Sequence, residues 1–269
     1  MRLVKHLVFM NLPLHNITLW LTRPAGQAKN LTKLLEAEGA NVFHLPLIQI
    51  EAIPQNKKIE NKIKKLNQYD MAFFISTNAA QFGMELIETY FSSLPKEVKY
   101  FCPGPATASI LQSYGLDVDH PEKAMSTEGL LILPGIRKVL LQESKNKKSA
   151  IIFRGAGGRE LLANALRSKG VNVNYIELYK RVLPEYKDSY LKNILKSKKP
   201  DGIIFSSVEA IHNFSTLFEK IYPEYKEIPI FVSSPRLKEV SKKIGFSSIS
   251  LLKAADDNSI AAGVTNPNE

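Results

Sequence analysis

The chain has 269 residues, of which 44% are hydrophobic, and its formal net charge is +10. This length can hold two domains, each with its own hydrophobic core. The only cysteine, Cys102, excludes an intrachain disulfide and gives no indication of an oxidising compartment, so we expect a cytoplasmic protein. The positive charge suits nucleic acid, an anionic membrane surface or a small polyanion, and charge alone does not choose among them.

The N-terminal stretch MRLVKHLVFMNLPLHN places basic residues ahead of a short apolar run, as a signal peptide does. Asn11 and Pro13 interrupt that run, and no cleavage site of the small-x-small type follows. We therefore expect an extension ahead of the first strand. Elsewhere no apolar run approaches the roughly 18 residues that would cross a bilayer, so no membrane partner is expected.

Buried strands are predicted wherever a short run of consecutive apolar residues occurs, because strands of a parallel sheet are covered on both faces. In chain order they are residues 17–21, 42–45, 47–53, 71–76, 98–102, 150–153, a strand from Val171, 178–183, 202–205, 230–232 and 248–251. Helices are predicted between them at residues 24–38, 59–66, 78–90, 106–114, from 128, from 161, and at 190–198, 208–220 and 236–244. This alternation predicts an α/β fold with parallel sheets.

A tandem duplication is visible at one constant offset along the chain, the offset that aligns Arg23 with Arg154. Residues 22–42 align with 153–173 without a gap, and eight of the 21 pairs are identical. Chance would give about one or two identities. The offset continues from 69–82 to 200–213, and a third match follows after a slip of one position. The chain is therefore predicted to form two similar α/β lobes.

Candidate binding residues lie where the predicted strands end, since ligands of open parallel sheets bind at the carboxyl ends of the strands. These positions carry hydroxyl, glycine and arginine residues: Thr22, Arg23, Ser76, Thr77, Gly104, Thr107, Arg154, Gly155, Ser206, Ser207, Ser233 and Ser234. Any single serine or threonine is more readily explained as a helix N-cap. Six such strand ends in two lobes favour the binding of carboxylates or phosphates.

The turn at residues 155–160 resembles a dinucleotide fingerprint only in part. Glu160 occupies the place of its third glycine, and a carboxylate there would oppose a pyrophosphate. Gly155, Gly157 and Gly158 are therefore interpreted as turn and close-approach positions. The five histidines show no metal-ligand spacing, so no metal site is expected. Cys102 is interpreted as a packed thiol because nothing nearby in the sequence would activate it.

Tyr179 lies on the extended segment that ends the repeated unit at residues 149–181, beside Lys180 and Arg181. A tyrosine at this position can simply pack against a core. Its phenol can also act as a general acid that donates a proton to a leaving hydroxyl. The residues themselves leave both interpretations open.

Taken together, these motifs resemble the uroporphyrinogen-III synthase family. The resemblance rests on TRPAGQAKNLTKLLEAEGA, YDMAFFISTNAA, GPATASILQSYG, STEGLL, FRGAGGRELLANALRSKG, IELYKR and DGIIFSSVEAIHNF, which follow the family's order over most of the chain. It implies two α/β lobes joined by a two-stranded β linker. The first lobe would comprise residues 1–46 and 183–269, the second lobe would comprise residues 52–177, and the linker strands would be residues 47–51 and 178–182.

The resemblance also implies an activity, the cofactor-free closure of hydroxymethylbilane to uroporphyrinogen III with inversion of ring D and loss of water. Tyr179 would assist loss of the ring-A hydroxyl, Thr107 matches the family's GxxTA threonine, and Arg23, Ser76, Arg154, Ser206 and Ser207 match substrate-facing strand ends. The last strand departs from the family pattern, with Ser233 and Ser234 in place of a glycine and threonines. The family further implies a monomer and a handover of substrate from the upstream bilane-forming enzyme.

Two other classes of protein compete with this interpretation. A two-lobed binding protein would retain a polyanion or tetrapyrrole without turnover. A nucleic-acid-binding module would use the basic charge, but the lysines lie on predicted surface helices without interleaved aromatic residues, so solvated helix faces are the better explanation.

Overall fold

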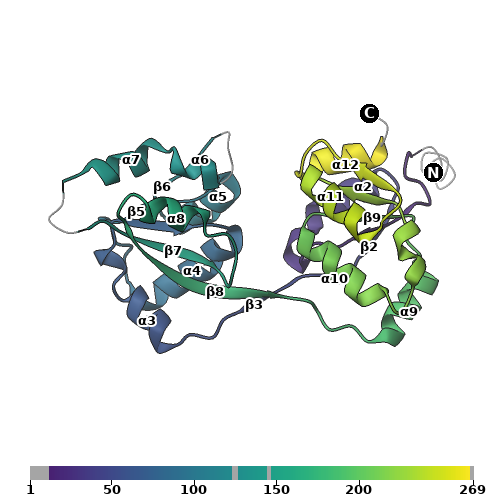
Figure 1. The fold of residues 1–269 in the computed structure, drawn as a ribbon, viewed down its shortest axis with the longest axis horizontal. Helices are drawn as coiled ribbons and strands as arrows, with labels where there is room; N and C mark the ends of the chain where they lie inside the picture. Colours follow the sequence, from purple (N-terminus) through teal and green to yellow (C-terminus); the bar gives the residue numbers. More distant parts are fainter. Residues whose placement is uncertain (1–11, 123–126, 144–146, 267–269) are drawn as a thin grey trace, which may run out of the picture. The chain divides into compact units, whose positions relative to one another are not determined.

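The computed structural model describes residues 12–122, 127–143 and 147–266 (Figure 1). Most of the expected N-terminal extension therefore lies outside the described residues. The chain divides into two compact units, each taken by itself below: unit 1 comprises Met1–Gln49 and Val182–Glu269, and unit 2 comprises Ile50–Arg181. In the described part of the chain, no helix is long and apolar enough to cross a membrane.

Unit 1 is a parallel sheet with the strand order β11-β10-β9-β1-β2. Its strands are β1 (Thr18–Leu21), β2 (Asn41–His44), β9 (Gly202–Phe205), β10 (Ile230–Val232) and β11 (Ile249–Leu251). The helices that follow or precede them are η1 (Ala25–Gln27), α2 (Lys29–Ala37), α9 (Asp188–Ser197), α10 (Val208–Phe218), η3 (Pro223–Glu227), α11 (Pro235–Ile244) and α12 (Asp257–Thr265).

Unit 2 contains a six-stranded sheet with the order β3-β8-β7-β4-β5-β6. Its strands are β3 (Gln49–Ala52), β4 (Met71–Phe74), β5 (Lys99–Phe101), β6 (Val118–Asp119), β7 (Ser149–Gly155) and β8 (Asn172–Val182). Its helices are α3 (Lys57–Ile63), η2 (Leu66–Gln68), α4 (Thr77–Tyr90), α5 (Pro105–Ser113), α6 (Thr127–Leu131), α7 (Pro134–Leu141) and α8 (Leu161–Arg167). Each pair of neighbouring strands in the series β8-β7-β4-β5-β6 is parallel.

The sheet orders confirm the duplication. At the offset found in the sequence, β1, β2, β9, β10 and β11 of unit 1 correspond to β7, β8, β4, β5 and β6 of unit 2. Reading unit 1 as β11-β10-β9-β1-β2 and unit 2 as β6-β5-β4-β7-β8 gives the same succession of corresponding strands. Strand β3 is the addition, at the edge next to β8.

Consecutive apolar residues form the strands of unit 2 because each face of the sheet has its own helical cover (Figure 1). On one face Phe74 and Phe153 stack with ring centroids 4.4 Å apart, together with residues of α3, α4 and α5. On the other face Phe73 and Phe101 stack at 5.1 Å, together with residues of α6, α7 and α8. The core thus holds the carboxyl ends of the strands, and the residues that follow them, in fixed positions.

The structure differs from the predicted elements in several places. The region predicted as a strand from Val171 and a separate segment at 178–183 is one strand, β8, because β7 pairs with it along much of its length. Strand β6 and helices α7 and α12 were not predicted. Strand β6 has two residues and α7 only eight, so each is too short to stand out in the sequence, whereas α12 is rich in small residues and shows a weak helical period.

Candidate functional site

The site in unit 2 is centred on Tyr179 of β8, which is 2% exposed. Alternation along the strand would turn Tyr179 away from the core face that Ile176 and Leu178 occupy. A β-bulge intervenes, because Arg154 pairs with Glu177 while Gly155 pairs with Tyr179. Tyr179 therefore lies in the same core cluster as Leu178, on the α4 side of the sheet.

Three neighbours fix the Tyr179 side chain. Phe82 of α4 stacks on its ring with centroids 5.9 Å apart. A methyl group on Gly155 would lie 2.6 Å from the ring, so the glycine is required for this close approach. The Tyr179 hydroxyl lies 2.9 Å from Ser76 Oγ, and either oxygen can be the donor. The ring packs against the core, as the first interpretation of Tyr179 proposed, and its hydroxyl has a polar partner; the role of general acid stays a prediction.

A cavity of about 280 Å³ lies beside this tyrosine, at the carboxyl ends of β4 and β7. Its lining includes Ser76 and Tyr179, the loop at residues 155–159, and Arg154 and Arg181. Gly157 and Gly158 have left-handed backbones, with φ of 71° and 97°, which confirms their interpretation as turn residues. The lining combines two phenols, those of Tyr175 and Tyr179, with one serine hydroxyl, guanidinium groups, the backbone of the glycine-rich loop and several apolar side chains.

The loop at residues 157–159 presents free hydrogen-bond donors. Among the described residues, no acceptor lies opposite the backbone N–H groups of Gly157, Gly158 and Arg159. The Arg159 guanidinium is exposed and forms no ion pair within this described set. The residues of this loop line the cavity, and unpaired amides and a guanidinium suit a carboxylate, which accepts several hydrogen bonds.

Arg154 lies beneath this loop and is 3% exposed, so it is not the open anion donor that the sequence suggested. Its guanidinium donates to Glu160 at 2.8 Å and to the Gly155 carbonyl at 3.2 Å, and it lies 4.9 Å from the Tyr175 ring centroid. Hydrogen bonds from Tyr175 and then from Arg154 lower the pKa of Glu160. Burial, followed by the bond to Glu160, raises the pKa of Tyr175. Arg154 holds the loop in shape.

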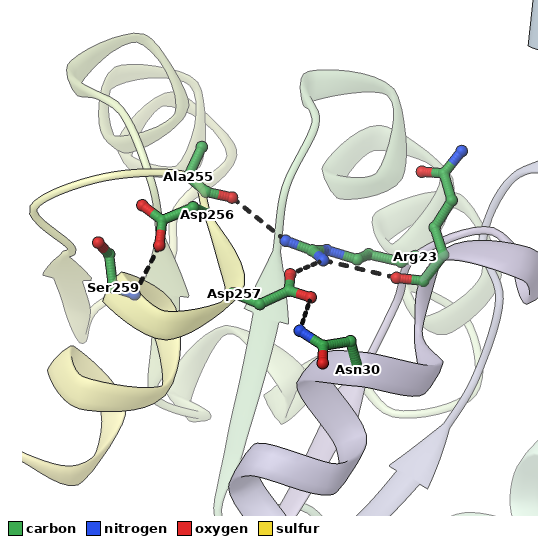
Figure 2. Close-up of polar contacts among 7 residues, drawn as sticks. Arg23, Asn30, Ala255, Asp256, Asp257 and Ser259 are labelled. Carbon is green, nitrogen blue, oxygen red and sulfur yellow. Dashed lines mark hydrogen bonds and ion pairs between the residues drawn. The ribbon is translucent and has the colours of Figure 1, made fainter. Parts of the chain in front are cut away.

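Arg23 of unit 1 occupies the same position in its own repeat and is also paired (Figure 2). It donates to Asp257 at 2.5 Å and to the Ala255 carbonyl at 3.3 Å, while Asn30 donates to the other oxygen of Asp257 at 2.8 Å. Asp256 caps α12 by accepting from the Ser259 N–H at 3.0 Å. The Arg23 side chain is 11% exposed, so its charge serves to join α12 to the end of β1.

The remaining predicted residues occupy varied surroundings. Thr22 is fully buried and its hydroxyl donates to the Ile204 carbonyl at 2.8 Å, so we withdraw it as a ligand donor. Ser76, Ser207 and Ser234 are N-caps, as the simpler explanation of strand-end serines proposed. Gly104 and Thr107 are buried at the start of α5, whereas Thr77, Ser206 and Ser233 are partly exposed.

Sequence reasoning missed several residues of the unit 2 site, namely Phe82, Arg159, Tyr175 and Arg181. Phe82 could have been found from the duplication, because its counterpart in the other repeat is Asn213 and Tyr179's counterpart is Ile48. Both members of this contacting pair therefore differ between the repeats. Cys102 is a packed thiol, as expected, and burial raises its pKa to about 11.

The fold and the site together define a class: a duplicated, two-unit α/β protein in which one unit carries a fixed tyrosine beside a donor-rich cavity. A family model described as "Uroporphyrinogen-III synthase HemD" matches residues 29–262. The chain belongs to the uroporphyrinogen-III synthase family.

Individual relatives agree with this assignment. A uroporphyrinogen-III synthase of Proteus mirabilis is 34% identical over 171 residues, which cover 63% of this chain and 83% of the relative. That of Escherichia coli K12 is 25% identical over 247 residues, covering 91% and 98%. The solved uroporphyrinogen-III synthetase of Helicobacter pylori 26695 has the same fold, with a TM-score of 0.59, 16% identity and coverage of 92% and 98%.

Proposed function

We propose that this chain closes hydroxymethylbilane to uroporphyrinogen III, with Tyr179 as the proton donor for the departing hydroxyl. Its family assigns it the activity of a cyclising lyase of porphyrin biosynthesis. The observation that carries the role of Tyr179 is its placement: a phenol fixed by Gly155 and Phe82 lines a cavity rich in anion donors.

The first step is a proton transfer coupled to loss of water. The Tyr179 O–H bond breaks and its proton joins the oxygen of the ring-A hydroxymethyl group, whose C–O bond then breaks. Water leaves, the pyrrole becomes an azafulvene cation, and Tyr179 is left as a phenolate. Attack by ring D, formation of a spiro intermediate, fragmentation and reclosure then follow, and their main requirement is that the flexible chain be held in a reactive conformation.

The substrate's eight carboxylates require hydrogen-bond donors rather than acids or metal ions. In unit 2 we assign this task to the backbone amides and guanidinium of residues 157–159, beside Gly155 and Ser76. Thr77, Gly104, Thr107, Ser206, Ser207 and Ser233 stay predictions as further binding residues, and the paired guanidinium groups of Arg23 and Arg154 support their neighbouring loops. We also propose a cytoplasmic monomer that receives its substrate from the bilane-forming enzyme.

The test is to supply freshly generated hydroxymethylbilane to the purified protein and to separate the oxidised products by isomer. Spontaneous closure gives the type I isomer, so the proposal requires a shift to type III. Type I alone, with the tetrapyrrole retained by the protein, would favour a binding protein without turnover.

A further inference from the structure

Ser76 has two hydrogen-bond partners, and together they constrain its hydroxyl. It is the N-cap of α4, and its Oγ accepts the Ala79 N–H at 3.0 Å. The same oxygen lies 2.9 Å from the Tyr179 hydroxyl. A capping serine is held in one rotamer by the backbone it caps, so Tyr179 is hydrogen-bonded to a group that is itself fixed.

One direction of the Ser76–Tyr179 hydrogen bond, with Ser76 as the donor, suits the proposed proton transfer. An oxygen that accepts one hydrogen bond is polarised and becomes a better donor of its own proton. When Ser76 donates to Tyr179 Oη, the phenol proton is free to point to a different acceptor, and Tyr179 lines the cavity beside it. The positive end of α4, a helix of 14 residues, lies behind Ser76 and favours negative charge on the tyrosine oxygen.

We infer that Ser76 is a positioning residue for Tyr179: its hydroxyl directs the phenol proton into the cavity and then stabilises the phenolate that remains after proton transfer. The inference rests on the proposed function of Tyr179. It adds that Ser76, as the N-cap of α4, connects the start of this helix to the tyrosine hydroxyl. It also changes the role expected for Ser76, from a direct contact with the substrate to an effect on the tyrosine.

Comparison of the two repeats supports this role. Ser207 of unit 1 caps α10 with the same geometry, its Oγ accepting the Ala210 N–H at 3.1 Å. The residue at the position of Tyr179 is there Ile48, which has no hydroxyl to orient. The capping serine is thus shared by both repeats as a structural element, and unit 2 adds a tyrosine to it.

The experiment compares kcat and KM for Ser76→Ala, Ser76→Thr, Tyr179→Phe and the double variant Ser76→Ala/Tyr179→Phe. Loss of a hydrogen bond to a developing charge should lower kcat of Ser76→Ala about 10-fold to 100-fold with little change in KM. The double variant should turn over at the rate of Tyr179→Phe alone, because Ser76 acts only through the tyrosine. Ser76→Thr, which keeps the hydroxyl, should restore most of kcat.

Asn56→Ala is the matched control for the loss of an N-cap. Asn56 caps α3 in the same unit by accepting from the N–H groups of Lys58 and Ile59, and it lies outside the cavity lining. It should lower the melting temperature about as much as Ser76→Ala does and leave kcat unchanged.

Four results would overturn the inference. A raised KM with normal kcat in Ser76→Ala would make Ser76 a direct substrate contact. Multiplicative losses in the double variant would make the two residues independent. Normal turnover by Ser76→Ala beside an impaired Tyr179→Phe would rule out the role of Ser76 alone. Normal turnover by Tyr179→Phe would rule out the proposed role of Tyr179 as well, while the synthase activity itself would stand.

Discussion

Gly155 is the residue on which the position of Tyr179 depends most closely. A methyl group there would lie 2.6 Å from one ring carbon and 2.7 Å from another, so the ring or the strand has to move. We predict that Gly155→Ala lowers the free energy of unfolding by about 1–3 kcal/mol, as overpacking does. It should also reduce kcat at least about tenfold, because small displacements of a reacting group are costly.

The control for this variant is Gly26→Ala. A methyl group on Gly26 would meet no atom within 4 Å, and Gly26 is the counterpart of Gly157 in the other repeat. It should melt at or near the wild-type temperature. The test is to measure the melting temperature of both variants by circular dichroism, together with their turnover. A Gly155→Ala protein with normal stability and kcat would contradict the packing argument.

Cys102 provides a second prediction at the scale of single residues. Its thiol is fully buried and points to the Gly104 carbonyl at 3.5 Å, and burial raises its pKa to about 11. Very little thiolate is therefore present at about pH 8, and the thiol has no access to reagents. We predict no reaction with a disulfide reagent in the native protein and one thiol per chain in guanidinium. Rapid reaction of the native protein would show that Cys102 is exposed or activated.

At the scale of elements, both repeats use the same hydrogen bond to join two neighbouring strands. It links the start of β7 to the residue before β4 in unit 2, and the start of β1 to the residue before β9 in unit 1. Asp70 accepts from the Ser149 N–H at 2.8 Å, and Asp201, its counterpart in the other repeat, accepts from the Thr18 N–H at 2.8 Å. Asp70 has in addition the Ser149 hydroxyl at 3.0 Å and Lys148 at 3.3 Å. Each carboxylate thereby sets the register between two strands that do not follow each other in the chain.

This arrangement predicts how stability depends on pH. Burial alone would raise the pKa of Asp70, but the backbone and side-chain hydrogen bonds from Ser149, with Lys148, lower it. A carboxyl whose folded pKa is depressed stabilises the protein above its unfolded value of about 3.9, and this contribution is lost as the pH falls through the folded value. Asp70→Asn should therefore cost about 1–3 kcal/mol at neutral pH and progressively less below about pH 4.

Thermal unfolding of Asp70→Asn and wild type across that pH range tests the prediction. Asp201→Asn is the companion variant, because it removes the charge from a carboxylate that has only the shared bond from a backbone N–H among the described contacts. The difference in melting temperature between Asp70→Asn and wild type should shrink as the pH falls. A difference that stays constant from neutral to acid pH would show that the charge of Asp70 contributes nothing to stability.

Elements were predictable where a repeated pattern or a continuous apolar run defined them. Strands β9 and β10 have the predicted bounds, since GIIF and IFV are short apolar runs between turn residues. The bulge in β8 was not predictable, because it follows from how β7 and β8 pair and leaves no mark in the alternation of residues. Without the bulge, the contact of Tyr179 with Phe82 and Ser76 could not be foreseen.

At the scale of the whole molecule, the duplication was visible in the sequence and the sheet orders confirm it. The partners of the two repeat arginines were not visible. Arg23 pairs with Asp257, 234 positions away in the chain, whereas Arg154 pairs with the nearby Glu160. Corresponding arginines are thus held by carboxylates from different elements, and only the folded chain determines which carboxylate is near. Their pairing also moves the predicted anion contacts to backbone amides and Arg159.

The two repeats differ at two contacting positions of the proposed site. Phe82 and Tyr179 of unit 2 correspond to Asn213 and Ile48 of unit 1, and Asn213 there donates to the Leu47 carbonyl at 2.7 Å. A shared scaffold therefore carries a phenol in one unit and a structural hydrogen bond in the other. This difference is consistent with the proposal that the proton-donating step belongs to unit 2.

The most direct test of the account is the rate and isomer composition of product formed from hydroxymethylbilane by Tyr179→Phe. Removing a general acid should lower the rate of type III formation by about 10²–10⁴ while the fold is kept. Tyr114→Phe, which removes an exposed hydroxyl bonded to Gln81, is the control and should behave as wild type. A Tyr179→Phe protein that forms type III product at the wild-type rate would contradict the account.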